Sequence, residues 1–125
     1  MNIFNLFKKG SIFVFDENND TYVTTINDIT FVCEQYNANY DQLAQQLANA
    51  YEKKISSIID FMLPDIKAMF DIDDKEIIKQ SLGKPQIDIQ RNVITYLDHT
   101  LDQMHIIDVE FDGIFARFYY TTIDG

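Results

Sequence analysis

The spacing of apolar residues changes twice along this chain, and that change constrains the fold more than any other feature of the sequence. From Tyr40 to Met62 apolar residues recur every three or four positions, the period of one face of an amphipathic α-helix. On either side, over residues 12–34 and 86–119, they alternate with polar residues or form short β-branched and aromatic runs, which is typical of strands. This order predicts an α+β fold, with helices packed against one face of a mainly antiparallel sheet.

Tight-turn residues divide the first strand region into three. The polar run 17–20 separates residues 12–15 from residues 21–26, and Asn27-Asp28 separates the latter from residues 29–34. Turns this short connect antiparallel neighbours. The sequence therefore predicts a three-stranded N-terminal meander.

The helical region contains two boundary signals. Pro64 has no amide proton to bond to the carbonyl of Asp60, so we expect the long helix to end or kink in the turn before it. The run 73–76, Asp-Asp-Lys-Glu, has the form of a capping box, and Gly83 is a typical helix stop. We expect one long helix and one or two short ones.

The strongest hairpin signal is Asp112-Gly113, because a two-residue type I′ turn needs positive φ at both central residues. With that turn, Phe111 pairs with Ile114 and Asp108 pairs with Arg117 across the hairpin. C-terminal hairpins supply the remaining strands, and the sequence leaves open whether they join the N-terminal meander in one sheet. The register predicts the following core face: Ile107, Val109, Phe111, Ile114, Ala116 and Phe118.

The same register predicts an opposite, outer face that combines carboxylates with aromatic rings. Such a face is typical of a contact surface for a basic partner, since aromatic anchors within a complementary potential favour specific binding. The alternative is an ordinary solvated face. The predicted partner-binding residues are Asp108, Glu110, Asp112, Phe115 and Tyr119.

Charge narrows the range of partners. The 125 residues, a length typical of one domain spanning residues 1–125, include 20 acidic and 10 basic residues, for a net charge of −10. The excess lies in residues 10–52 and 92–125, the parts predicted to contain the strands. Nucleic acids and anionic membranes need clustered Lys and Arg, so this balance argues against both and favours a basic protein partner.

The N-terminus and the single cysteine indicate a cytoplasmic protein. Lys8 and Lys9 follow the apolar residues of the first nine positions instead of preceding them, which is not the pattern of a signal peptide. Cys33 is the only cysteine, and it lies in a β-prone run where buried, unreactive cysteine is the common outcome. No apolar stretch is long enough to span a membrane.

One cluster points to a different chemistry. Asp98, His99, Asp102 and His105 include ligand types found in zinc and non-haem iron sites, so a small metal-dependent enzyme or ligand-binding protein is the alternative function. Their spacing fits no standard ligand pattern, and polar residues are common between strands. We therefore expect no metal or other cofactor, and no enzymatic activity.

The order of the predicted elements is also similar to that of a known group of proteins. A hairpin opening at residues 10–17, one long helix, and a closing hairpin at residues 105–113 with an Ile-Asp-Gly ending at 123–125 resemble small acidic bacterial proteins described as domains of unknown function. Some such families lie beside polymorphic toxin genes and are regarded as immunity proteins. The resemblance implies an immunity-like inhibitor of a basic toxin; it assigns no residues and leaves the oligomeric state open.

Overall fold

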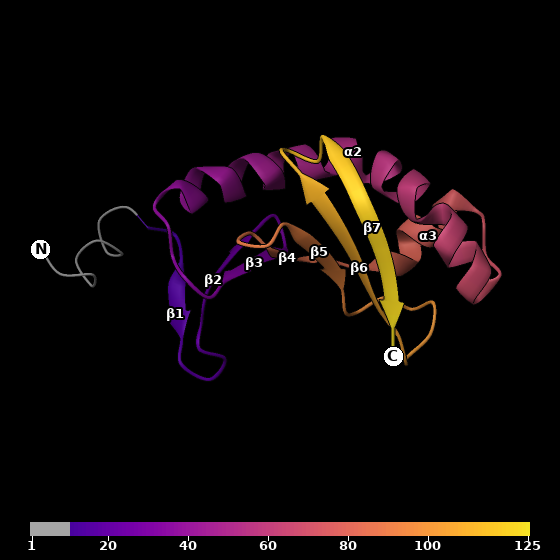
Figure 1. Cartoon of the computed structure of the whole chain (residues 1–125), viewed down its shortest axis with the longest axis horizontal. Coiled ribbons are helices and arrows are strands. Elements are labelled where there is room, and N and C mark those ends of the chain that lie inside the picture. The colour runs from indigo at the N-terminus through magenta and orange to yellow at the C-terminus, as the bar shows by residue number, and fades with distance from the viewer. Residues whose placement is uncertain (1–10) are drawn as a thin grey trace, which may run out of the picture.

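Within residues 11–125 the fold consists of seven strands in one sheet and two helices, and it is of the α+β class (Figure 1). The computed structural model describes residues 11–125; the expectations for Lys8, Lys9 and the N-terminal segment lie outside this range. The strands are β1 (Val14–Asp16), β2 (Thr21–Ile26), β3 (Ile29–Cys33), β4 (Gln86–Asp88), β5 (Val93–Tyr96), β6 (Ile106–Asp112) and β7 (Arg117–Asp124). The helices are α2 (Asn39–Phe70), which arches over the sheet, and α3 (Lys75–Leu82).

The order of strands in the sheet follows their order in the chain, from β1 to β7. All neighbours are antiparallel except β3 and β4, which are parallel because α2 and α3 carry the chain back to the end of the sheet where β3 began. The amide of Thr30 donates to the carbonyl of Pro85, and that of Ile89 donates to the carbonyl of Val32. The N-terminal meander and the C-terminal strands therefore form a single sheet.

The N-terminal meander is confirmed, and its turns depend on the predicted polar residues. Asn27 and Asp28 both have positive φ, 52° and 66°, as a type I′ turn requires. Before β2, a carboxylate oxygen of Asp16 accepts a hydrogen bond from the backbone amide of Asn18 at 3.0 Å. This side-chain bond replaces a ladder bond at the point where the chain reverses.

Helix α2 extends further than the sequence predicts. The stripe between Tyr40 and Met62 is confirmed as its buried face. Of the two expected outcomes before Pro64, an end or a kink, the end does not occur, because the helix continues through Pro64 to Phe70. Pro64 itself is exposed, whereas Met62 and Ile66 on either side of it are fully buried. Packing of these two side chains against the core offsets the hydrogen bond that proline cannot make.

Helix α3 begins and ends where the sequence predicts. A carboxylate oxygen of Asp74 accepts hydrogen bonds from the backbone amides of Glu76 and Ile77, which satisfies two donors of the first turn. At the other end, Gly83 has φ of 70° and lies close to the backbone of Asp98. A Cβ atom at position 83 would be 3.3 Å from the Asp98 carbonyl oxygen, so glycine suits this close approach.

The core lies between α2 and the face of the sheet that α2 covers. Alternate strand residues point into it, and the side chain of Tyr96 from β5 meets that of Tyr51 from α2 through a hydrogen bond of 2.6 Å between their hydroxyl groups. Ile78 and Leu82 of α3 complete the same core. The buried strand residues are Ile29, Phe31, Cys33, Ile87, Ile94, Tyr96, Ile107, Val109 and Phe111.

The closing hairpin has a longer turn than the sequence predicts. Asp112 pairs with Arg117 and Phe111 pairs with Phe118, so residues 113–116 form the turn, and the predicted pairs of Phe111 with Ile114 and of Asp108 with Arg117 are wrong. The turn is closed by a hydrogen bond from the amide of Ala116 to the carbonyl of Asp112 at 2.9 Å.

Burial of Phe115 explains the longer turn. Its φ is 55°, and its side chain is only 2% exposed, with its ring centroid 5.0 Å from that of Phe111 and 6.1 Å from that of Tyr51. The predicted placement of Phe115 on the outer face is therefore wrong. Burying an aromatic ring gains more free energy than the left-handed conformation costs.

A β-bulge follows in the same hairpin. Val109 pairs with Thr121 and Phe111 with Phe118, so Glu110 alone lies opposite two residues, Tyr119 and Tyr120. Both tyrosines are exposed, at 47% and 65%. The bulge restores the alternation, so Phe118, Thr121 and Ile123 of β7 point towards α2 and are half-buried.

Candidate binding surface

The face of the sheet that α2 does not cover carries every carboxylate of the strands. Ile87, Ile107, Val109 and Phe111 point into the core, so the residues that alternate with them point outward. Asp16 of β1 pairs with Thr21, and Asp124 of β7 pairs with Ile106, so both of these acids point to the same side of the sheet as the other strand carboxylates. We call this side the open face. Its strand carboxylates are Asp16, Asp88, Asp108, Glu110, Asp112 and Asp124.

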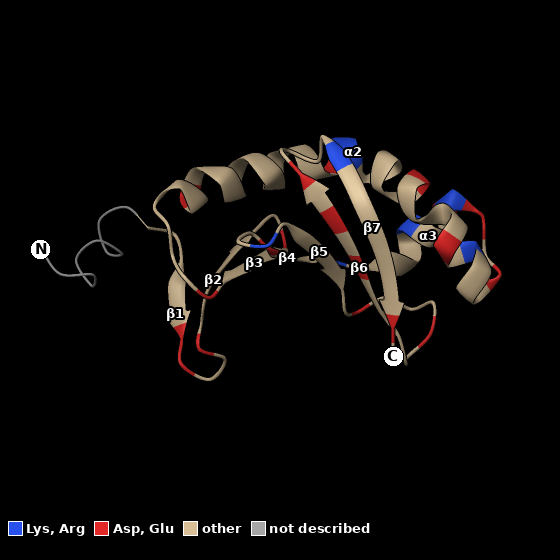
Figure 2. Ribbon diagram, in the orientation of Figure 1, with Lys and Arg blue, Asp and Glu red and all other residues tan. Residues whose placement is uncertain are grey.

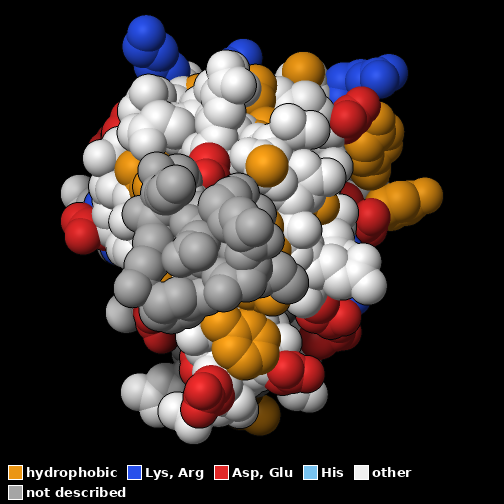
Figure 3. Space-filling model, turned by 90° about the vertical axis from the view of Figure 1, so that its left-hand side faces the viewer, with side chains coloured by type: hydrophobic (Ala, Val, Ile, Leu, Met, Phe, Trp, Pro, Cys, Tyr) orange, Lys and Arg blue, Asp and Glu red, His pale blue; other side chains and the backbone are white. Residues whose placement is uncertain are grey.

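Basic residues are nearly absent from the strands. Arg117, at the start of β7, is the single Lys or Arg within β1–β7, whereas the lysines of residues 11–125 lie in α2, in α3 and in the connection after α3. Figure 2 shows this segregation, with acidic bands along β6 and basic residues mostly on the helices. In the view from the β1 end, the prominent basic side chains rise from the α2 side of the molecule (Figure 3).

Two of the six carboxylates are neutralised locally. Asp112 accepts hydrogen bonds from the Tyr119 hydroxyl at 3.2 Å and from the Arg117 guanidinium at 3.1 Å, and these bonds hold the pKa of the Asp112 carboxyl below its usual value. Asp88 pairs with Arg91, 2.9 Å away, which also contacts Glu34. Both ion pairs lie at the ends of strands.

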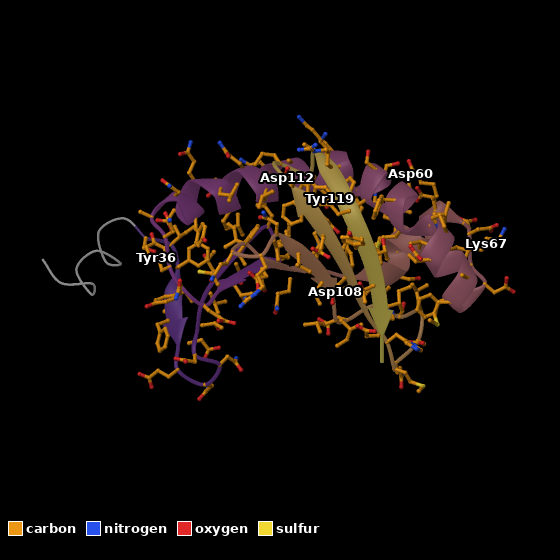
Figure 4. The ribbon with its side chains drawn as sticks, viewed as in Figure 1. Tyr36, Asp60, Lys67, Asp108, Asp112 and Tyr119 are labelled. Carbon is orange, nitrogen blue, oxygen red and sulfur yellow. The ribbon has the colours of Figure 1, made fainter. Side chains whose placement is uncertain are left out.

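The remaining four carboxylates have no ion-pair partner among residues 11–125. Asp108 accepts a hydrogen bond from the Thr95 hydroxyl at 2.6 Å, which orients it on β6. Glu110 and Asp124 are exposed, and their side chains form no hydrogen bond within residues 11–125, whereas Asp16 bonds only within its turn. Figure 4 shows Asp112 and Tyr119 together at one end of β6 and β7, with Asp108 further along β6. The unpaired negative charge is therefore concentrated around β6.

Beside this acidic region the open face is apolar. Val14, Val23 and Val32 are cross-strand neighbours in a row, and the next apolar member is Val93, beyond Asp88. The surface is hollowed near β2 and β3, where a depression of about 350 Å³ forms. Its lining residues are Asp16, Asn19, Thr21, Val23, Thr30, Val32 and Gln86. The open face thus combines a valine and threonine area around β2 and β3 with carboxylates on β1, β4, β6 and β7.

Four of the five predicted partner-binding residues lie on the open face: Asp108, Glu110, Asp112 and Tyr119. The fifth, Phe115, belongs to the core. The sequence analysis missed Tyr120, which is more exposed than Tyr119, because strict alternation along β7 assigns it to the opposite face. Only the bulge, which the sequence does not signal, turns both rings outward.

In the cluster that the sequence offers as an alternative metal site, both histidines form structural hydrogen bonds. The buried ring of His99 accepts at Nδ1 from the Leu101 amide at 3.2 Å, so Nε2 carries the proton and donates to the His105 carbonyl at 2.5 Å. Both ring nitrogens of His99 are therefore engaged in hydrogen bonds. The Phe70 ring, at the end of α2, packs against both imidazoles, with centroids 5.9 Å from His99 and 6.0 Å from His105.

Asp102 orients the second histidine of this cluster. It accepts hydrogen bonds from the amides of Met104 and His105 and lies 2.5 Å from His105 Nδ1. Desolvation raises the pKa of Asp102, but these bonds outweigh it and lower the pKa to about 2. Asp98 is exposed and forms no side-chain bond to this group. Within residues 11–125, no three His, Cys, Asp or Glu side chains are placed to hold a metal ion.

Cys33 is buried on the core side of β3. Its side chain is 1% exposed, and burial, with a smaller effect of the nearby Asp88 carboxylate, raises the pKa of the thiol to about 11. A thiol with so high a pKa is a poor nucleophile near neutral pH.

No family model, no curated protein and no solved structure matches this chain. Neither helix of the described range has the length and apolar character that crossing a membrane requires. The geometry of the open face is therefore the basis for assigning a function.

Proposed function

We propose that this protein is a non-enzymatic binding domain that recognises a basic protein through its open face. The observation that carries the proposal is the segregation of charge: six strand carboxylates share one face, and Arg117 is the one base in the strands. Four of these carboxylates lack an ion-pair partner among residues 11–125. A basic protein would complement that potential, whereas nucleic acid or an anionic membrane would be repelled.

The aromatic and apolar groups of the open face support a protein as partner. Tyr119 and Tyr120 project beside Glu110, and tyrosines are enriched among residues that dominate binding energies. The valine row supplies apolar area that a partner side chain would cover. Charge would accelerate encounter, and these groups would slow dissociation.

The most concrete form of this proposal is an immunity-like inhibitor. An acidic face that covers the cationic surface of a basic toxin, such as a nuclease, would block access to the toxin's anionic substrate. The resemblance to small acidic bacterial proteins is consistent with that role, and we place such an inhibitor in the cytoplasm. The rigid sheet would present the carboxylates without rearrangement.

Two charge reversals test the proposal. Glu110→Lys alters the open face, whereas Glu52→Lys makes the same change of charge on an exposed position of α2, on the other side of the molecule. Partners captured by the tagged wild-type protein at low ionic strength are measured against both variants by surface plasmon resonance. We expect Glu110→Lys to slow association about tenfold, and the control to change it by less than about twofold.

Ionic strength provides the second measurement. Association with the wild type should slow as the Debye length contracts to about 8 Å at physiological salt. Equal association of both variants, or association independent of salt, would show that the carboxylates of the open face are merely solvated and would refute the proposal.

A further inference from the structure

Strand β7 forms one edge of the sheet, and its outer edge pairs with no strand of residues 11–125. It is the longest strand, with eight residues, and it lies at the front of the sheet in Figure 1. A free edge of this length is a template on which another chain can add a strand. The groups that β7 presents at that edge determine which kind of strand can pair with it.

The hydrogen bonds of β6 determine which backbone groups of β7 point outward. The amide of Phe111 donates to the carbonyl of Asn92, which precedes β5, so the backbone of Phe111 bonds away from β7. In an antiparallel ladder such pairs alternate, and the residues opposite Phe111, Val109 and Ile107 therefore direct their own amide and carbonyl groups to the free edge. These residues of β7 are Phe118, Thr121 and Ile123.

A groove runs beside this edge, between β7 and the second half of α2. It has a volume of about 260 Å³ and is lined by Asp65, Ala68, Met69, Thr121 and Ile123. Met69 is 47% exposed, so the groove offers apolar surface to a neighbour. The hydroxyl oxygen of Thr121 is buried and has no hydrogen-bond partner among the described residues. An added strand would cover the exposed apolar surface of Met69.

Carboxylates flank the edge on both sides. Asp65 lies on the α2 side of the groove, and Asp124 of β7 and Glu110 of β6 lie on the open face. None of the three forms an ion pair with another residue of the range 11–125. Arg117, the one base of β7, is engaged by Asp112. A strand that pairs with β7 would therefore meet unpaired negative charge from both faces.

We propose that the basic partner binds by adding a strand to β7, with its backbone bonded to Phe118, Thr121 and Ile123 and its lysine or arginine side chains directed at Asp65, Glu110 and Asp124. This inference rests on the proposed function and specifies how the partner docks. Backbone bonds give such strand addition its affinity, and alternate side chains give it specificity. A second copy of the chain is the less favourable occupant, because its β7 region would bring the same carboxylates to the interface.

A synthetic peptide tests the mode of binding before a partner is identified. The probe repeats Lys-Lys-Val-Val over the length of β7, which places lysines on both faces of an added strand; the control peptide has glutamate at every lysine position. Backbone amide exchange of the isotopically labelled protein is followed by NMR. We expect the amides of Thr121 and Ile123 to exchange rapidly in the free protein and to become protected with the lysine peptide only.

Variants separate strand addition from simple charge attraction. Thr121→Pro removes an outward-pointing amide without breaking a hydrogen bond to β6, and edge strands accept proline at such positions. This variant should weaken binding of the lysine peptide about tenfold. Asp65→Lys, on the exposed surface of α2, leaves the sheet intact and should weaken the peptide similarly by repulsion. Glu52→Lys is the charge-matched control and should have little effect.

The outcomes discriminate between this inference and the proposed function. Protection of Thr121 and Ile123, with loss of binding in Asp65→Lys, supports strand addition. A different result would overturn strand addition and leave the proposed function standing. In that case a partner or peptide binds the wild type without protecting the amides of Thr121 and Ile123, and its binding is lost in Glu110→Lys. Protection in the free protein, accompanied by dimers in sedimentation, would identify a second copy as the occupant and overturn the inference. A partner whose binding is unaffected by both Glu110→Lys and Asp65→Lys refutes both.

Discussion

Truncation of Phe115 to alanine tests the closing hairpin, because the two registers predict opposite results. In the structure the ring is 2% exposed and packs against Phe111 and Tyr51, so Phe115→Ala removes a fully buried aromatic side chain and should cost about 3–5 kcal/mol of the free energy of unfolding. The left-handed backbone offers no compensation, since alanine at φ of 55° is strained as phenylalanine is.

Phe118→Ala and Tyr119→Ala are the reference variants with which the loss of stability in Phe115→Ala is compared. Phe118 is half-buried, with its ring centroid 5.6 Å from that of Phe61, so its truncation should cost about 2 kcal/mol. Tyr119 is exposed and loses one hydrogen bond to Asp112, a change of about 1 kcal/mol.

Urea unfolding followed by circular dichroism measures all three free energies, with unchanged m-values as the check that the denatured state is unaltered. The structure requires Phe115→Ala to be the most destabilising of the three. A smaller loss of unfolding free energy for Phe115→Ala than for Phe118→Ala would instead support a two-residue turn at residues 112–113. It would refute the register observed in the structure.

Three further predictions concern groups inside the fold. Tyr51→Phe and Tyr96→Phe should each cost about 1–2 kcal/mol in urea unfolding, and the double variant should cost less than the sum, because each single change leaves a buried hydroxyl without its partner. Native Cys33 should resist iodoacetamide near neutral pH, and rapid alkylation would contradict its burial. Asp102 has a lowered pKa, so its stabilising effect is present above the usual carboxyl pKa of 3.8 and is lost as pH falls towards about 2; the stability difference between wild type and Asp102→Asn should shrink over that interval.

The sequence was informative wherever local chemistry decides the structure. Turn residues such as Asn27-Asp28 and the cap Asp74 act within a few positions of themselves, so the meander and the start of α3 followed directly from the residue types. The alternation along β6 likewise identified the outward carboxylates. These features need no knowledge of what packs against them.

Packing over long distances decided the features that the sequence did not reveal. Asp112-Gly113 is well suited to a two-residue turn, but a four-residue turn buries Phe115 against Tyr51 of a distant helix, and that gain prevails. Pro64 disfavours helix locally, yet burial of Met62 and Ile66 carries α2 past it. Pairing of β3 with β4 also depends on the crossover as a whole, not on any residue of either strand.

The distribution of charge on the open face is hard to explain by solvation alone. The threonines beside Asp108, namely Thr95 on β5 and Thr122 on β7, already make the surface polar, and alternating lysine and glutamate would do so without mutual repulsion. Carboxylates gathered on one face instead destabilise the folded chain, most of all where Glu110 and Asp124 lack a counter-charge among residues 11–125. A cationic partner of the kind proposed would remove that repulsion on binding, so the feature that weakens the free protein would strengthen the complex. Added salt should therefore stabilise the free protein while it weakens the proposed complex.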